Sequence, residues 1–203
     1  ALTPTIPAVR FSYHLISDIF SMRTSISHPL QIAAVQAGQL FGRIGITFCP
    51  GKFDPQAMSG AWNRDLELDL DAIRDWGAAA IVTLIEQHEF KLLRVERLGE
   101  EVQRRNMTWF HLPIVDVQIP DAGFEDAWRD NGKKVRALLR DGRDVVVHCR
   151  GGLGRAGPIA SRLLVEFGMN PEAAMREVRK VRPGAIETSA QENYVRALRA
   201  AAE

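Results

Sequence analysis

Cysteine is scarce in this chain, whose 203 residues include only Cys49 and Cys149. Two cysteines are too few for the disulfide framework that holds together many small secreted domains. The sequence also lacks any run of about 18 apolar residues, and no basic region followed by an apolar core opens it. We therefore predict no insertion into a membrane.

An excess of charge of one sign is absent as well. The 26 Lys and Arg residues almost balance the 25 Asp and Glu residues, for a formal net charge of +1. This balance provides no general attraction to nucleic acid, and we predict none as a partner. Apolar residues make up 46% of a chain long enough to bury a large core. One globular domain of unspecified oligomeric state is therefore expected.

The most informative stretch combines a short strand, a cysteine, a glycine-rich turn and the start of a helix. Three consecutive valines at 145–147 predict a buried strand, and residues 154–165 predict a helix. Between them lies the segment His148-Cys149-Arg150-Gly151-Gly152-Leu153-Gly154-Arg155. The glycines let successive N–H groups point at one centre, and Arg155 offers a planar fork for two phosphate oxygens. The sequence thus predicts an anion cradle whose field, reinforced by the helix N-terminus, favours the thiolate of Cys149.

This segment resembles the Cys-x5-Arg signature of the cysteine-dependent protein tyrosine and dual-specificity phosphatases. It is most similar to the kinase-associated (cyclin-dependent kinase inhibitor 3-like) branch of that superfamily. The resemblance implies hydrolysis of phosphate monoesters through a phosphocysteine intermediate, with Cys149 as nucleophile. It implies that phosphate is bound by Arg150, Gly151, Gly152, Leu153, Gly154 and Arg155. The plainer alternative is a buried cysteine that ends a strand beside a glycine-rich turn.

Such an enzyme needs an acid that protonates the leaving oxygen. Residues 112–121, Leu-Pro-Ile-Val-Asp-Val-Gln-Ile-Pro-Asp, follow a predicted strand and resemble the acid loop of the kinase-associated branch. By that match Asp116 is the acid. Asp121, beside Pro120, is the alternative. Both aspartates can instead be turn or capping residues, because Asp next to Pro commonly marks turns.

A third segment, residues 182–191, resembles the Arg-Pro-Gly-x-Ile-Glu-Thr-x-x-Gln stretch of dual-specificity phosphatases. The match implies that Gln191 orients the water that hydrolyses the phosphocysteine. From the residues alone, the favoured interpretation of the segment is a helix start with Thr188 or Ser189 as N-cap, and only its place after the two other motifs favours the functional one.

Two neighbours of the phosphate loop have supporting roles. The side chain of His148 should point to the opposite side of the strand from Cys149, so we expect it to brace the loop by hydrogen bonds. Ala156 departs from the family pattern, in which Ser or Thr follows the loop arginine and its hydroxyl stabilises the thiolate. We therefore predict a slow enzyme, limited by breakdown of the phosphoenzyme. Cys49 is expected to be a core residue, although a redox bridge to Cys149 stays open.

The resemblance implies a phosphoprotein substrate, because the loop lacks the additional lysines of phosphoinositide enzymes. The choice between phosphotyrosine and phosphothreonine or phosphoserine is left open. No metal or other cofactor is required, since the cradle and Arg155 supply the neutralising charge. A thiolate enzyme needs a reducing compartment, which favours the cytoplasm. Two other functions are weighed: a weakly active or inactive phosphopeptide-binding module, suggested by Ala156, and a sulfur-transfer or arsenate-reducing enzyme, disfavoured by Asp116 and Gln191.

Alternation of strands and helices predicts a single α/β domain with a mostly parallel central sheet flanked by helices, as in protein tyrosine phosphatases. Ligands of such sheets bind beyond the carboxyl ends of the strands, where Cys149 falls. We assign the phosphatase domain to residues 39–203 and an N-terminal extension, packed on the domain or leading into it, to residues 1–38. Predicted strands cover 40–49, 78–85 and 107–115. Predicted helices cover 69–76 with Asp69 as N-cap, 88–105 with a break at Gly99, 124–140, 170–183 and 189–202. In the helix at 170–183, Asn170 is predicted as the N-cap and Pro171 as the first helical residue.

Overall fold

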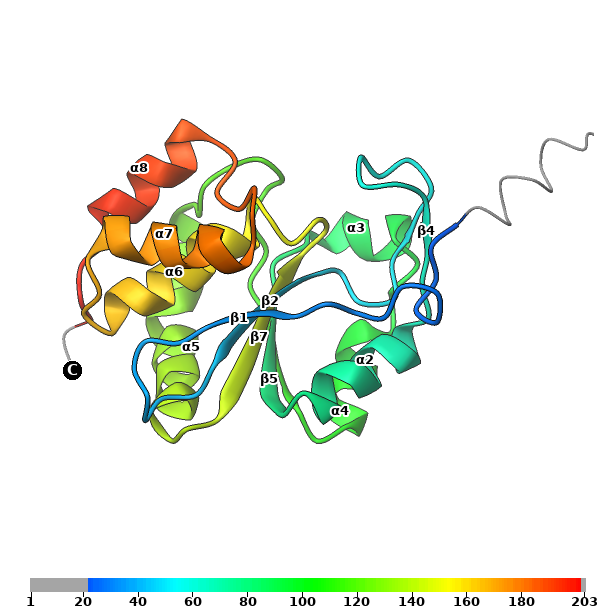
Figure 1. Ribbon diagram of the computed structural model, residues 1–203, viewed down its shortest axis with the longest axis horizontal. Helices are drawn as coiled ribbons and strands as arrows, with labels where there is room; N and C mark the ends of the chain where they lie inside the picture. Colours follow the sequence, from blue (N-terminus) through cyan, green and yellow to red (C-terminus); the bar gives the residue numbers. More distant parts are fainter. Residues whose placement is uncertain (1–21, 202–203) are drawn as a thin grey trace, which may run out of the picture.

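A five-stranded sheet forms the centre of the computed structural model, which describes residues 22–201 (Figure 1). Its strand order is β1-β2-β7-β5-β6, with β1 antiparallel to β2 and the other neighbours parallel. The strands are β1 (Ala33–Val35), β2 (Ile44–Phe48), β5 (Ala78–Thr83), β6 (Thr108–His111) and β7 (Asp144–Cys149). A separate two-stranded ribbon pairs β3 (Phe53–Asp54) with β4 (Trp62–Asn63). The strand with the cysteine, β7, therefore lies in the middle of the sheet.

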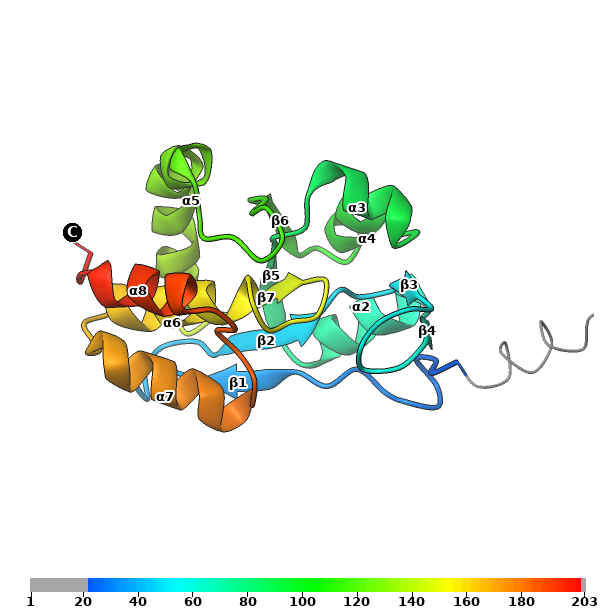
Figure 2. The same cartoon turned by 90° about the horizontal axis from the view of Figure 1, so that it is seen from above.

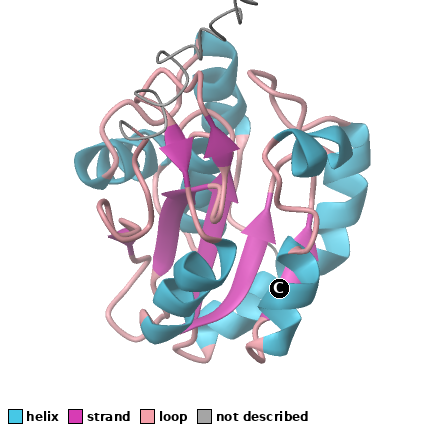
Figure 3. Cartoon of the chain, turned by 90° about the vertical axis from the view of Figure 1, so that its right-hand side faces the viewer, coloured by secondary structure: helices cyan, strands magenta, loops and turns pink. Residues whose placement is uncertain are grey.

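Helices cover both faces of the sheet (Figures 1 and 3). One face carries α2 (Leu66–Asp75), α3 (Gln87–Leu92) and α4 (Leu98–Arg104), and the other carries α5 (Ala122–Arg140), α6 (Ala156–Glu166), α7 (Pro171–Val181) and α8 (Ser189–Ala197). The valines of β7 explain this layering, because successive strand side chains point to opposite faces. Val145 and Val147 join the core under α5 and α6, whereas Val146 joins the core under α2 and α4.

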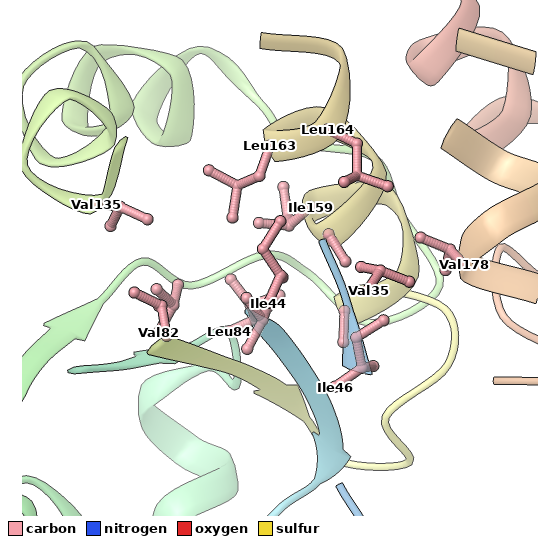
Figure 4. Packing of buried hydrophobic residues seen from close by; sticks show 14 of the residues in the cluster. Val35, Ile44, Ile46, Val82, Leu84, Val135, Ile159, Leu163, Leu164 and Val178 are labelled. Carbon is pink, nitrogen blue, oxygen red and sulfur yellow. The ribbon is translucent and has the colours of Figure 1, made fainter. Parts of the chain in front are cut away.

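The larger core lies between the sheet and α6. Figure 4 shows Ile44, Ile46 and Val82 of the strands facing Ile159 and Leu163 of α6, all of them buried. Close packing of these branched side chains fixes the position of α6 against the end of β7. The predicted α/β fold with a mostly parallel sheet is thus confirmed.

Several predicted boundaries differ from the observed ones. The strands predicted at 40–49 and 107–115 are shorter, and the last helix ends at Ala197. The predicted helix at 88–105 is two helices, separated by residues 93–97 and not at Gly99. The role of Asp69 was predicted wrongly: Asp65 caps α2, whereas Asp69 is buried inside that helix and pairs with Arg64 at 2.7 Å. Asp69 does not cap the helix because its carboxylate forms a buried ion pair with Arg64.

The N-terminal extension is described only in part, because residues 1–21 lie outside the described residues. Within the remainder, β1 pairs with β2 in the register Ala33↔Ile46 and Val35↔Ile44. Residues 33–35 therefore add an edge strand to the sheet, although the sequence suggested no element there. The division of the chain at residue 38 stays a prediction.

Candidate active site

Cys149 is the last residue of β7 and is buried at the carboxyl end of the parallel strands. Its Sγ accepts a hydrogen bond from the backbone N–H of Gly152 at 3.2 Å. Residues 150–155 form a loop from β7 into α6, which begins at Ala156. In Figures 1 and 2 this yellow loop lies between the green loop that precedes α5 and the cyan loop that joins β3 to β4. The strand end, the helix start and two further loops thus converge on one thiol.

The glycines of this loop are not equivalent. Gly152 has φ +71°, and a Cβ there would lie 2.5 Å from the carbonyl carbon of Thr47, so a side chain is excluded. A Cβ on Gly154 would lie 2.0 Å from a carboxylate oxygen of Glu187, whereas Gly151 has open space around it. The backbone curl therefore depends on Gly152, and Gly154 makes room for the segment that carries Glu187.

The carbonyl groups of the loop are held by cationic side chains from outside it. Arg182 donates to the carbonyls of Gly151 and Gly152, each at 3.1 Å, and Lys52 donates to the carbonyl of Arg150 at 3.3 Å. The side chain of Arg150 itself is paired with Asp54 through two hydrogen bonds of 2.9 and 3.0 Å. Because these contacts hold the carbonyl groups away from the centre of the loop, the N–H groups of the loop are free to point toward an anion at that centre.

Arg155 closes the loop and is buried. Its guanidinium donates to Glu89 at 2.5 and 3.0 Å and to the carbonyl of Ile114 at 3.2 Å, and it lies 3.1 Å from an oxygen of Asp116. Burial acts against its charge, but the hydrogen bond with Glu89 and the nearby sulfur of Cys149 hold the pKa of Arg155 above its ordinary value. The arginine is therefore permanently charged and oriented before any substrate arrives.

Glu89, which holds Arg155 in place, was not predicted as a site residue. It lies in α3, where it forms a capping box with Glu86. Burial tends to raise the pKa of Glu89, but the hydrogen bond from Arg155, the hydrogen bond from the backbone of Glu86 and the charge of Arg155 together outweigh this effect and lower the pKa. The spacing of Glu86 and Glu89 resembles a helix start and carries no signal of the contact with Arg155.

We expect Glu89→Gln to lower the free energy of unfolding by about 3 kcal/mol, because it leaves a buried guanidinium without its counter-charge. The value of kcat/KM should fall on the order of a hundredfold as Arg155 loses its orientation. Glu89 has a lower pKa in the folded chain than in the unfolded chain. The contribution of Glu89 to the free energy of unfolding is therefore fully present above about pH 4.3, the pKa of an unfolded glutamate. It is lost as the pH falls through the pKa of Glu89 in the folded chain.

The prediction is checked by measuring the free energy of unfolding of the wild type and of Glu89→Gln in denaturant titrations between about pH 2 and 7. The variant should show a weaker loss of stability on acidification than the wild type. Glu96→Gln, at an exposed position between α3 and α4, is the control and should leave activity and stability unchanged. Equal stability of Glu89→Gln and wild type at pH 7 would contradict the prediction.

The two candidate acids occupy different places. Asp116 lies on the loop before α5 with its side chain 55% exposed, and it lines the same cavity as Cys149. This loop is held in an uncommon conformation, since Val117 has φ +65°. Asp121 is the N-cap of α5, where its carboxylate accepts from the N–H of Phe124 at 2.8 Å, and it does not line the cavity. The geometry favours Asp116 and assigns Asp121 a capping role.

Gln191 caps a helix and lies close to two loops of the site, although it does not line the cavity that contains Cys149. It forms a capping box with Thr188, whose hydroxyl accepts from its N–H at 3.2 Å. Its amide is fully buried, lies 3.5 Å from the carbonyl of Gln118 on the acid loop and would lie 3.4 Å from a Cβ on Gly154. The helix cap therefore places the amide between the phosphate loop and the acid loop.

His148 directly precedes Cys149 in β7 and is fully buried. Its Nε2 is 2.8 Å from the hydroxyl of Thr83, which accepts from the indole N–H of Trp109 at 2.9 Å. Burial lowers the pKa of His148 to about 3, so the ring is neutral at physiological pH. These contacts support the bracing role and not that of a general base.

A cavity of about 690 Å³ opens above Cys149. Its lining includes the phosphate loop, Asp116 and Glu187, together with Phe48, Met58 and Trp62. The rings of Phe48 and Trp62 are 5.1 Å apart, and Met58 is fully exposed in the loop between β3 and β4. An aromatic wall of Phe48 and Trp62 and several charged groups thus line one cavity, which suits a phosphate group attached to an apolar or aromatic body.

Comparison with known proteins identifies the domain. A family model described as "Swiss Army Knife protein, DSP-PTPase phosphatase domain" matches residues 52–195. The chain belongs to this phosphatase family. It is therefore a cysteine-dependent protein tyrosine or dual-specificity phosphatase, and the predicted resemblance is confirmed.

Individual relatives agree with this assignment. The chain is 28% identical over 172 residues to cyclin-dependent kinase inhibitor 3 of Mus musculus, covering 84% of the chain and 76% of the relative. It is 28% identical over 126 residues to protein tyrosine phosphatase type IVA 3 of Homo sapiens, covering 62% and 68%.

Solved structures with the same fold include kinase associated phosphatase with its catalytic site cysteine replaced by serine. That structure has a TM-score of 0.72 and 25% identity, with 82% of this chain and 92% of that chain covered. Tk-PTP in its active form has a TM-score of 0.62 and 26% identity, covering 82% and 95%. Among residues 22–201, no helix is long and apolar enough to cross a membrane.

Proposed function

We propose that this phosphatase hydrolyses phosphate monoesters of phosphoproteins through a phosphocysteine intermediate on Cys149. The observation that carries the proposal is the convergence of Cys149, Arg155 and Asp116 on one cavity, although they come from a strand end, a helix start and a separate loop. A nucleophile, a fixed cation and a carboxyl group are the three parts that this chemistry needs.

In the first step, the Cys149 thiolate attacks phosphorus and forms the S–P bond while the bond to the leaving oxygen breaks. Asp116 gives its proton to that oxygen. In the second step, water attacks the phosphocysteine, the S–P bond breaks, and the Asp116 carboxylate takes the proton from the water. Arg155 and the loop N–H groups stabilise the charge on the non-bridging oxygens. Gln191 orients the water from its buried place between the two loops.

A phosphoprotein substrate is supported by the absence of lysine from residues 150–155 and by the aromatic wall of the cavity. A thiolate nucleophile at Cys149 needs a reducing compartment, which supports a cytoplasmic location.

Rapid-quench experiments with ³²P-labelled phosphotyrosine and phosphothreonine peptides test the mechanism. We expect labelled protein to form within the first turnover and to decay at the steady-state rate. Tryptic mapping should locate the label on the peptide that contains Cys149. Phosphate release without any labelled protein would overturn the phosphocysteine mechanism. The turnover rates of the phosphotyrosine and phosphothreonine peptides show which substrate is preferred.

The departure at Ala156 yields a separate prediction. Ala156 is fully buried directly after Arg155, and in the described residues the only hydrogen bond to the Cys149 sulfur comes from Gly152. A hydroxyl at this position would add a hydrogen bond to a charged group, worth about 1.5–3 kcal/mol. We expect Ala156→Ser to raise kcat roughly ten- to a hundredfold by easing departure of the thiolate from phosphate.

The measurement compares burst amplitude and steady-state rate for the two proteins. In the wild type, a burst of product should precede a slow steady state. In Ala156→Ser, the difference between the burst rate and the steady-state rate should be smaller. Ala160→Ser, four residues further along α6, is the matched control, since it adds a hydroxyl on the same helix one turn away. An unchanged steady-state rate in Ala156→Ser would show that breakdown of the phosphoenzyme does not depend on this hydroxyl.

A further inference from the structure

Lys52 is a buried lysine beside the active site that no sequence motif identified. It follows β2 and the turn at Gly51, and its side chain lies 2% exposed in the wall of the cavity that contains Cys149. Its Nζ donates to the carbonyl of Arg150 at 3.3 Å, across 98 positions of sequence. Lys52 therefore contacts the first residue of the phosphate loop.

The charge of Lys52 lacks a carboxylate partner. In the described part of the chain, no carboxylate oxygen pairs with its Nζ within 4.0 Å, and the nearby Asp54 is held by two hydrogen bonds from Arg150. The ammonium lies 5.0 Å from the ring centre of Phe48 and 5.6 Å from that of Trp62. Aromatic faces attract a cation only weakly, whereas burying an unpaired ammonium is costly. An anion in the cavity would provide the missing compensation.

The site supplies such anions during the proposed reaction. Burial lowers the pKa of Lys52, and the charge of Asp54 opposes this shift most, followed by the sulfur of Cys49 and, more weakly, that of Cys149. A thiolate at Cys149 and a bound phosphate would each add negative charge to the same cavity. The sulfur itself has few stabilising neighbours, because Ala156 offers no hydroxyl and Gly152 donates its one hydrogen bond.

We propose that Lys52 is a positioning residue of this active site, which turns the Arg150 carbonyl outward and supplies a second positive charge for the thiolate and the bound phosphate. The inference rests on the proposed function, since it assigns Lys52 to the same phosphate site. Lys52 thereby takes over part of the stabilisation that a hydroxyl at position 156 would provide.

The test uses Lys52→Met, which keeps an apolar stem against Phe48 and Trp62 but removes the charge, and Lys52→Arg, which restores a charge. Lys133→Met, at an exposed position on α5, is the matched control. Binding of inorganic phosphate is measured by calorimetry with each change placed in a Cys149→Ser background. Alkylation of Cys149 by iodoacetamide at pH 7 is measured with each change in the wild-type background.

Loss of one charge-assisted interaction should weaken phosphate binding about tenfold in Lys52→Met and slow alkylation of Cys149 by a similar factor. Lys52→Arg should recover most of both quantities, and Lys133→Met should match its background. A folded Lys52→Met with unchanged binding and alkylation would overturn the inference, as would a folded Lys52→Arg as defective as Lys52→Met. If Lys52→Met fails to fold, Lys52→Gln carries the same comparison.

These readouts need no turnover. Phosphate binding that depends on Lys52 in a protein without phosphatase activity would therefore refute the proposed function and leave the role of Lys52 standing. Normal phosphatase activity in a Lys52→Met variant with unaltered binding would refute the role of Lys52 alone.

Discussion

Replacing Cys149 by serine should reduce phosphate release to the uncatalysed background, a loss on the order of 10⁴-fold or more. A serine hydroxyl is not ionised in this cradle and cannot form the thiophosphate bond on which both steps depend. Phosphate release is measured with an aryl phosphate and with phosphotyrosine and phosphothreonine peptides. Phosphate binding should survive the change, because Arg155 is held by Glu89 and the carbonyl of Ile114 and does not depend on the sulfur for its orientation.

The chain offers a matched control in its other cysteine. Cys49 is fully buried, and burial raises the pKa of its thiol well above the ordinary value, so it stays protonated and unreactive. Cys49→Ala should therefore retain activity. Phosphate release that is indifferent to Cys149→Ser would exclude the phosphocysteine mechanism. Tight phosphopeptide binding without any turnover in the wild type would instead favour the phosphate-binding module suggested by Ala156.

Asp116→Asn should lower kcat for phosphopeptides by about 10²- to 10⁴-fold, the usual contribution of a general acid. The loss should be much smaller for an aryl phosphate whose phenol is a good leaving group, because that oxygen departs without a proton. Comparing the two substrates with wild type and variant separates loss of the acid from a general disturbance of the site.

Asp121→Ala is the control for this experiment. It removes the side-chain cap of α5 and should lower the free energy of unfolding by about 1 kcal/mol while leaving kcat unchanged. Urea denaturation measures the first effect and phosphopeptide turnover the second. The reverse pattern, with kcat lost in Asp121→Ala and kept in Asp116→Asn, would make Asp121 the acid.

The predicted helix starts show which structural features can be predicted from neighbouring residues in the sequence. Asn170 was predicted as an N-cap with Pro171 as the first helical residue, and Asn170 does accept from the N–H of Glu172 at 3.0 Å. Asp69 was predicted as a cap in the same way, and that prediction is wrong because Arg64 and the N–H of Gly51 hold its carboxylate inside α2. A cap prediction succeeds where no distant group competes for the side chain.

The sequence by itself determined the features that depend on neighbours in the chain. Three valines, the glycines at 151, 152 and 154 and a helix predicted over 154–165 indicated a cysteine in an anion cradle, and the structure has a strand that ends at Cys149 and a helix that begins at Ala156. The sequence also predicted a helix start near residue 188, but it left open whether Thr188 or Ser189 is the cap, and the structure shows Thr188.

Only the tertiary structure decided which groups complete the cradle. Glu89 reaches Arg155 across 66 positions of sequence, and Lys52 reaches Arg150 across 98. Neither contact leaves a periodic or spacing signal, because each arises where two elements happen to pack at the carboxyl end of one sheet. The contact of Asp116 with Arg155 at 3.1 Å is also long-range, whereas the cap that Asp121 forms with the N–H of Phe124 is local. Local chemistry thus predicted the candidate nucleophile, and long-range packing placed the charges around it.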